Sequence, residues 1–126
     1  MIETRRDLKN CLAIEKCLYT PAKFRDSVLA VICNDFSYEL WKYICTLRKS
    51  ELHFNNCSFR KSGIVARLHD IAYVYYRWQR NRQGKKLGLE IYENNFEPGL
   101  CIYHAVGGGT YEWICQSRKK LQTPWK

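Results

Sequence analysis

Apolar residues recur at helical spacing through the first two thirds of the chain. One set follows Ser37 and consists of Leu40, Trp41, Ile44 and Leu47, while Lys42, Arg48 and Lys49 fall on the other side. This spacing predicts an amphipathic helix, for which Ser37 is a suitable N-cap. A short apolar run over residues 27–33 precedes it and is interrupted by Asn34 and Asp35. We therefore expect residues 1 to about 82 to be helical.

A second helix is predicted after a loop. Residues 53–63 are rich in asparagine and serine, which indicates a loop. The apolar positions that follow recur at helical spacing and are Ile64, Val65, Leu68, Ile71, Ala72, Tyr75 and Trp78. Gly84 is expected to end this helix, because glycine is favoured just past a helix C-terminus.

The pattern changes after Gly84. Helical periodicity gives way to short β-like pieces at residues 89–91 and 100–102, separated by turn residues at 94–95 and 98–99. Phe96, Ile102 and Gly108 lie six residues apart. Two such intervals are a weak sign of a repeat, because repeat architectures need several copies to bury their apolar faces.

These residues resemble the serine acetyltransferases, in particular the serine acetyltransferase-like branch of bacterial surface-polysaccharide gene sets. The resemblance is specific over residues 99–108, which read Gly-Leu-Cys-Ile-Tyr-His-Ala-Val-Gly-Gly, and looser over residues 24–98. In that family a helical N-terminal region leads into a left-handed parallel β-helix of hexapeptide repeats. The resemblance implies an α+β fold, with a helical region over residues 1–84 and the first one to two coils of a β-helix over residues 85–108.

The resemblance also implies an activity. Enzymes of this family transfer the acetyl group of acetyl-CoA to a hydroxyl of serine or of a sugar, and they assemble as homotrimers. A histidine removes the hydroxyl proton, a task that suits a neutral imidazole with a pKa near neutral pH. His104 matches the position of that histidine, and Glu90 falls near the acid that orients it. The spacing from Glu90 to His104 is one residue shorter than in the family, so three alternatives stay open: Glu93, Glu97, or no orienting acid at all.

Residues 109–126 do not continue the pattern. This tail has no six-residue period and contains two tryptophans. Permitted codons for the tail, read one base later, give a hexapeptide-like sequence, and we interpret it as the product of a shifted reading frame. The alternative is a divergent tail that packs on the helices. Because the family binds acetyl-CoA along later coils, we expect the chain to be an impaired enzyme that binds acetyl-CoA weakly or not at all.

Composition narrows the class of protein. The chain has 126 residues, 46% of them hydrophobic, which suits one domain or a domain with a fragment. It has no apolar run long enough to span a membrane, and its charged N-terminus leads into no secretion signal, so we expect a cytoplasmic protein. Its seven cysteines form no Cys-x-x-Cys or Cys-His cluster. We expect reduced, mostly buried thiols and no metal site.

Two other functions stay open. The net charge is +9, and basic residues gather over residues 77–86, close to Tyr73, Tyr75, Tyr76 and Trp78. Basic and aromatic side chains together can bind nucleic acid, but cations at a helix C-terminus also have a plain electrostatic explanation, and nucleic acid is the less favoured partner. The helical region could instead be an interaction module that docks on an intact acyltransferase subunit. His53 and His69 lie in no motif, and His69 is expected on the surface.

Overall fold

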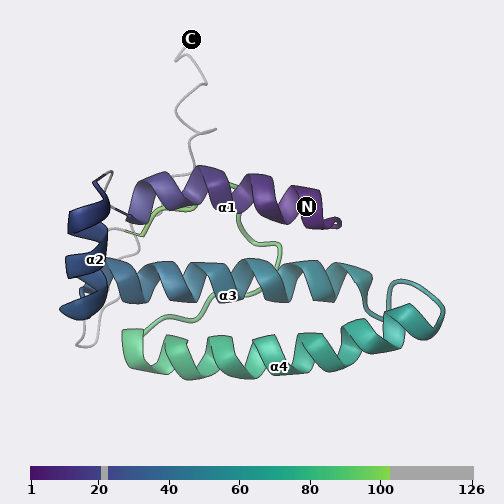
Figure 1. The fold of residues 1–126 in the computed structure, drawn as a ribbon. Helices are drawn as coiled ribbons and strands as arrows, with labels where there is room; N and C mark the ends of the chain where they lie inside the picture. The colour runs from purple at the N-terminus through teal and green to yellow at the C-terminus, as the bar shows by residue number, and fades with distance from the viewer. Residues whose placement is uncertain (21–22, 103–126) are drawn as a thin grey trace, which may run out of the picture.

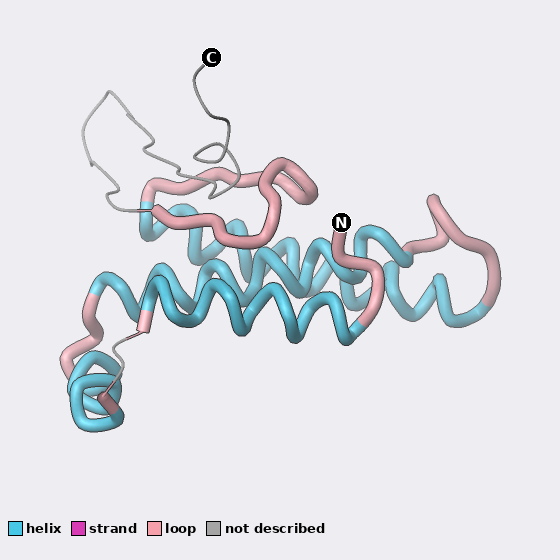
Figure 2. Tube along the Cα trace, turned by 90° about the horizontal axis from the view of Figure 1, so that it is seen from above, coloured by secondary structure: helices cyan, strands magenta, loops and turns pink. Residues whose placement is uncertain are grey.

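A computed structural model describes residues 1–20 and 23–102 of the chain. This part contains four helices: α1 (Arg5–Tyr19), α2 (Phe24–Ile32), α3 (Phe36–Asn56) and α4 (Ile64–Leu87). In Figure 1 the long helix α3 lies between α1 and α4 and runs opposite to both, while the short α2 crosses the end of the layer. Residues 88–102 return over these helices as a loop, as the view from above shows (Figure 2).

The first helix begins at a well-formed cap. The Thr4 hydroxyl accepts a hydrogen bond from the Asp7 backbone N–H at 3.1 Å, and the Thr4 N–H donates to the Asp7 carboxylate at 2.9 Å. This reciprocal capping box satisfies two backbone donors that a helix start otherwise leaves without partners. The hydrogen bonds from the Thr4 side chain and backbone also lower the pKa of Asp7.

The helix predictions are confirmed, but three of the predicted helix ends were wrong. Helix α3 starts one residue before the expected cap Ser37, with Asp35 at the N-cap position, and it continues to Asn56 through part of the predicted loop. Helix α4 runs past Gly84 to Leu87, and Gly88 ends it in the left-handed conformation, with φ at 68°. Glycine adopts this conformation without the steric penalty of a side chain.

Gly84 serves close packing rather than helix termination. A Cβ atom at this position would lie 2.4 Å from the carbonyl oxygen of Leu89 and 3.3 Å from the ring of Tyr43. The same glycine carbonyl accepts a hydrogen bond from the Leu89 N–H at 2.8 Å. Gly84 therefore allows the chain that leaves α4 to fold back against the helix.

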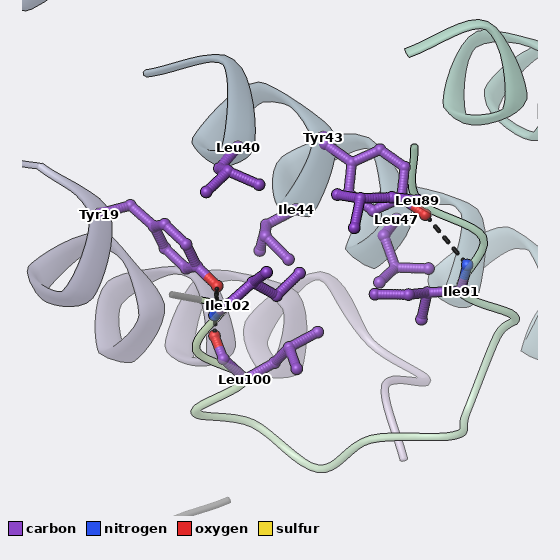
Figure 3. Packing of buried hydrophobic residues seen from close by; sticks show 9 residues of the cluster. All are labelled: Tyr19, Leu40, Tyr43, Ile44, Leu47, Leu89, Ile91, Leu100 and Ile102. Atoms are coloured by element: carbon purple, nitrogen blue, oxygen red, sulfur yellow. Dashed lines mark hydrogen bonds between the residues drawn. The ribbon is translucent and has the colours of Figure 1, made fainter. Parts of the chain in front are cut away.

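The main core joins the helices to the loop that follows them (Figure 3). Helices α1 and α3 contribute Tyr19, Leu40, Tyr43, Ile44 and Leu47, and the loop contributes Leu89, Ile91, Leu100 and Ile102. All nine are buried, and Ile44 and Leu47 are fully so. A smaller cluster of Ile2, Cys11 and Leu52 joins the start of the chain and α1 to α3. The four apolar residues of the predicted β-like pieces are thus core residues.

The predicted α+β fold was wrong for the residues that the structure describes. Within residues 1–20 and 23–102 there are helices and loops but no strand or sheet. Residues 85–87 form the last turn of α4, and residues 89–102 lie on the helices as an irregular loop instead of opening a β-helix. The physical reason is in the hydrogen bonds: several backbone N–H groups of this loop donate to side chains of α1 and α3 rather than to a neighbouring strand. Residues 103–108 and the tail at 109–126 lie outside the described residues.

Two expectations from composition can be compared with the described residues. None of these helices is both long enough and apolar enough to cross a membrane. Six of the cysteines are described, and all six are free thiols. Cys11, Cys57 and Cys101 are buried, whereas Cys17 and Cys33 are exposed, so burial is less general than expected.

Candidate functional site

The segment that carries the family resemblance is fixed to the helices by two tyrosines. We call residues 89–102 the docked segment. The Tyr43 hydroxyl oxygen accepts a hydrogen bond from the Ile91 N–H at 3.1 Å, and the Tyr19 hydroxyl donates to the Leu100 carbonyl at 2.8 Å while accepting from the Ile102 N–H at 2.9 Å (Figure 3). Burial raises the pKa of Tyr43, which keeps its hydroxyl neutral. Each end of the docked segment is therefore held at a set position on the core.

The middle of the docked segment is held by a buried arginine. Arg48 of α3 is 1% exposed. Its guanidinium donates to the Glu15 carboxylate, with a shortest distance of 2.5 Å, and to the Glu51 carboxylate at 2.8 Å. The same group donates to the carbonyl oxygens of Phe96 and Glu97, each at 3.0 Å. The sequence pattern placed Arg48 on a polar helix face, and this was wrong because the docked segment and α1 cover that face.

The two carboxylates also bind the backbone of the docked segment. Glu15 of α1 accepts from the N–H groups of Gly99 and Leu100 at 3.2 Å each, and Glu51 accepts from the Asn94 N–H at 3.1 Å. Burial raises the pKa of Glu51, while the Arg48 charge and its hydrogen bonds oppose that rise. Buried charges are tolerated when each is paired and hydrogen-bonded. We call Glu15, Arg48 and Glu51 the buried ion triad; it fixes the turn at residues 94–100.

A second ion pair ties the docked segment to α4. Arg80 and Glu93 form a salt bridge in which both side chains are buried, and Glu93 also accepts from the Ser50 hydroxyl at 3.3 Å. Asn94 exchanges amide hydrogen bonds with Asn55 of α3 at 3.1 and 2.8 Å. Contacts from α1, α3 and α4 thus converge on fourteen consecutive residues.

The predicted site residues are not brought together by these contacts. Glu90 is exposed, and its carboxylate accepts from the Tyr92 hydroxyl at 2.5 Å. Glu93, one alternative to Glu90, is committed to Arg80. Glu97, the other alternative, is exposed and contributes its backbone carbonyl to Arg48. His104 lies outside the described residues. Of the three acids, Glu90 and Glu97 are therefore exposed, and the Glu93 side chain is buried.

Glu90 lies on the wall of a groove at the end of α4. The groove has a volume of about 850 Å³. Its lining combines an aromatic ring, two cations and one acid, and consists of Trp78, Asn81, Arg82, Gly84, Lys85, Gly88, Leu89 and Glu90. The Arg82 guanidinium lies over the Trp78 ring at 5.6 Å. The groove lies against the residues where the docked segment leaves α4, so its shape depends on that attachment.

The basic cluster at residues 77–86 is smaller than the sequence indicates. Arg80 is 3% exposed and paired with Glu93, which removes it from any surface patch. Arg77 lies over the ring of Tyr73 at 6.0 Å. The buried pair of Arg80 and Glu93 thus removes one of the five cations of residues 77–86 from the exposed surface.

A histidine pair went unnoticed in the sequence. The Nδ1 atoms of His53 on α3 and His69 on α4 are 2.8 Å apart, and the ring of Tyr76 stacks on His53 at 5.3 Å. Burial lowers the pKa of His53, and the nearby charges of His69 and Arg5 lower it further. His69 was expected on the surface, and the structure instead places its ring against that of His53. No sequence motif identifies this pair, because its members lie sixteen positions apart on two different helices.

The thiols of the described residues are poor candidates for nucleophiles. Burial raises the pKa of Cys11 to about 12 and that of Cys45 to about 11. A nucleophilic cysteine needs a thiolate and therefore a lowered pKa. Among the described residues, no three metal-ligating side chains of histidine, cysteine, aspartate or glutamate lie together.

Comparison of the chain with protein-family models, with curated proteins and with solved structures finds no match.

Proposed function

We propose that this chain belongs to an acetyl-CoA-dependent O-acyltransferase of the serine acetyltransferase-like kind. The observation that supports the proposal is the docked segment. The resemblance is most specific over residues 99–108, of which the structure describes 99–102. Tyr19 and Glu15 of the buried ion triad hold these described residues through hydrogen bonds to their backbone. A catalytic group must be held at a fixed position to react efficiently, and these contacts fix residues 99–102, which precede His104.

In this proposal His104 is the general base and Glu90 its orienting acid. His104 lies two residues after Ile102. The Ile102 N–H donates a hydrogen bond to the Tyr19 hydroxyl. Glu90 lines the groove beside Trp78, Arg82 and Lys85, which is where a hydroxyl acceptor would enter. The base takes the hydroxyl proton as the oxygen attacks the thioester carbonyl of acetyl-CoA; the thiol of CoA leaves with a proton. The acceptor is a hydroxyl of serine or of a sugar.

The test follows transfer of an isotope-labelled acetyl group from acetyl-CoA to serine and to a panel of sugars. The acetylated products are identified by mass spectrometry. A colorimetric thiol assay is unsuitable because the chain carries seven cysteines. Two chains are compared: the sequence as printed, and one expressed from the same gene with the shifted frame restored after Gly108 and followed through the coding DNA downstream. We expect transfer by the second chain and little or none by the first.

Variants assign the roles. In the transferring chain, His104→Ala should reduce turnover by about 100-fold or more, as loss of a general base does. Glu90→Gln should reduce it less, and Glu3→Gln, at an exposed position of the N-terminal segment, should leave it unchanged. Absence of transfer to any hydroxyl by both chains, with both folded, contradicts the proposal.

Binding gives a second readout for the printed sequence. We expect isothermal titration with acetyl-CoA to give weak or no binding. Micromolar binding would overturn the prediction that the printed chain binds acetyl-CoA weakly or not at all.

A further inference from the structure

Helix α4 carries an exposed apolar face on the side away from α3. Its members are between 54% and 81% exposed and are Ile64, Val65, Leu68, Ile71, Val74, Tyr75 and Trp78. We call them the outer face of α4. In Figure 1, α4 forms one edge of the helical layer, with α3 on its other side. Large side chains in a continuous exposed stripe mark an interaction surface more often than isolated ones do.

The spacing of the outer face is that of a helix-packing seam. Ile64, Leu68, Ile71, Tyr75 and Trp78 follow one another at intervals of four, three, four and three residues. This alternation keeps apolar side chains on one line and is the pattern by which two helices pack along each other. The seam covers fifteen residues, or about 22 Å of helix.

The contacts inside the chain use the opposite side of α4. Tyr76 stacks on His53, and Tyr73 lies against Phe54 at 5.4 Å. Arg80 pairs with Glu93, and Gly84 meets Leu89. A helix that is apolar on both sides is expected to be covered on both. The described part of the chain covers only one.

The size of the outer face suits a protein interface. Each aliphatic side chain of this kind contributes roughly 60 to 120 Å² of apolar surface, and aromatic side chains contribute more. Seven of them, each more than half exposed, give on the order of 600 Å². That is at the upper end of the largest apolar patch on typical monomers and approaches the roughly 800 Å² that each partner buries in a standard interface.

We infer that the outer face of α4 packs against the same face of a second copy of this chain, with the two helices antiparallel. The face is aliphatic in its first half and aromatic in its second. An antiparallel pair centred near Tyr73 sets Leu68 against Trp78 of the partner subunit and Ile71 against Tyr75 of the partner subunit. Each large ring then meets a smaller aliphatic side chain, which is how facing layers fill space.

Charge also selects the antiparallel pair. The last turns of α4 are strongly basic and carry Arg77, Arg82, Lys85 and Lys86, whereas the first half carries Arg67, His69 and Asp70. A parallel pair would bring two basic ends together, and like charges at short range repel. In an antiparallel pair centred near Tyr73, Arg82, Lys85 and Lys86 each lie about 27 to 39 Å along the helix axis from the same residue of the other copy, and Arg77 lies about 12 Å from it. All these separations exceed the screening length of about 8 Å at physiological salt. This pairing does not depend on the acyl-transfer proposal.

The experiment measures the molar mass of the full chain by light scattering after gel filtration, over about a hundredfold range of concentration, since mass action sets the fraction of dimer. We expect a species of twice 15.0 kDa that dissociates on dilution. Ile71→Glu should raise the dissociation constant at least about tenfold. The matched control is Ile32→Glu on α2, because Ile32 and Ile71 are exposed to 73% and 71%.

The outcomes decide the proposal. A dimer that is lost in Ile71→Glu and kept in Ile32→Glu, with the helical circular dichroism of both variants unchanged, supports it. A monomer throughout the range, a dimer equally sensitive to both substitutions, or a different oligomer overturns it. Because Ile71 is exposed, the variant is expected to fold; Leu68→Gln, a milder change in the same seam, should give the same result.

A charge swap tests the direction of the helices. Leu68→Glu and Trp78→Lys should each weaken the dimer. Combined in one chain, they should restore it, because in the antiparallel pair each new acid faces the new base of the partner. In a parallel pair like residues face each other, so the double variant would be weaker than either single one, and the antiparallel arrangement would be wrong.

Discussion

The two long helices of this chain show the same periodic pattern in sequence and opposite surroundings in the structure. In α3 the stripe of Leu40, Ile44 and Leu47 is between 0% and 3% exposed, whereas in α4 Leu68 and Ile71 are 61% and 71% exposed. Helix α3 is central, with α1 on one side and α4 on the other (Figure 1). Helical periodicity therefore identifies an apolar face, and only the arrangement of neighbours decides whether the chain itself covers it.

The largest expected effect comes from removing the buried positive charge of Arg48 on α3. Arg48→Met leaves the carboxylates of Glu15 and Glu51 buried without their cation, and it removes the donor to the carbonyls of Phe96 and Glu97. Breaking a buried ion pair on one side costs about 3–5 kcal/mol. We expect a loss of this size in the free energy of unfolding, measured by denaturant titration near neutral pH.

Lys42→Met is the matched control for that variant. Lys42 pairs with Glu39 on the same helix at 2.5 Å, but its side chain is 40% exposed, and exposed pairs contribute about 0–1 kcal/mol. Similar losses in the two variants would mean that the buried ion triad does not hold the docked segment.

Truncating one isoleucine in each helix tests directly whether burial differs between α3 and α4. Ile44→Ala removes a fully buried side chain and should cost about 2–5 kcal/mol through lost burial and the cavity left behind. Ile71→Ala, measured at a protein concentration where the chain is monomeric, should change stability by about 0.5 kcal/mol or less. A large loss in dilute Ile71→Ala would show that the chain covers the outer face of α4 itself.

A third change tests whether α4 and the docked segment depend on close approach. Gly84→Ala places a Cβ atom 2.4 Å from the Leu89 carbonyl, so the segment must shift although alanine favours helix. Overpacking of this kind costs about 1–3 kcal/mol, and we expect a net loss in thermal stability. Gln79→Ala, in the same helix, should be neutral or slightly stabilising, since alanine has the highest helix propensity. A gain in stability for Gly84→Ala would contradict the close-packing role.

Sequence alone predicted the helices better than it predicted what surrounds them. The 3.6-residue period and the loop composition located α3 and α4 to within a few residues, because local propensity and periodicity carry that information. Gly84 was misjudged because glycine both ends helices and permits close approach, and the tertiary contact with Leu89 decided between these roles. The docked segment was misassigned for a similar reason: Leu89, Ile91, Leu100 and Ile102 were recognised as apolar, but not that helices would bury them.

In the candidate site, too, the sequence identified individual residues but not their tertiary contacts. The sequence singled out Glu90, with Glu93 and Glu97 as alternatives. The structure separates these acids by their surroundings: the Glu93 side chain is buried against Arg80, while Glu90 lines the groove. Arg48 gave a partial signal, since Glu51 follows it by three residues on the same helix face. Its second partner, Glu15, is thirty-three residues away, and pairings at that range are not encoded in local pattern.

The smallest predicted effect concerns the histidine pair between α3 and α4. Burial, His69 and Arg5 lower the pKa of His53, and its Nδ1 lies 2.8 Å from that of His69. Because two protonated Nδ1 atoms cannot share that hydrogen bond, the folded chain binds fewer protons here than the unfolded chain, in which His53 has the ordinary histidine pKa of 6.5. This contribution to stability is complete above that pH and is lost as the pH falls through the lowered pKa.

We therefore expect the free energy of unfolding to decrease on acidification from about pH 7.5 to about pH 5.5, the range in which histidine titrates. His53→Gln should flatten that dependence, and His69→Gln should reduce it by removing the neighbouring charge. The raised pKa of Glu51 acts in the opposite direction at lower pH and is present in all three chains, so the difference between them isolates the histidines. A pH dependence that is the same in His53→Gln and in the parental chain would mean that the contact between α3 and α4 does not sense the protonation of His53.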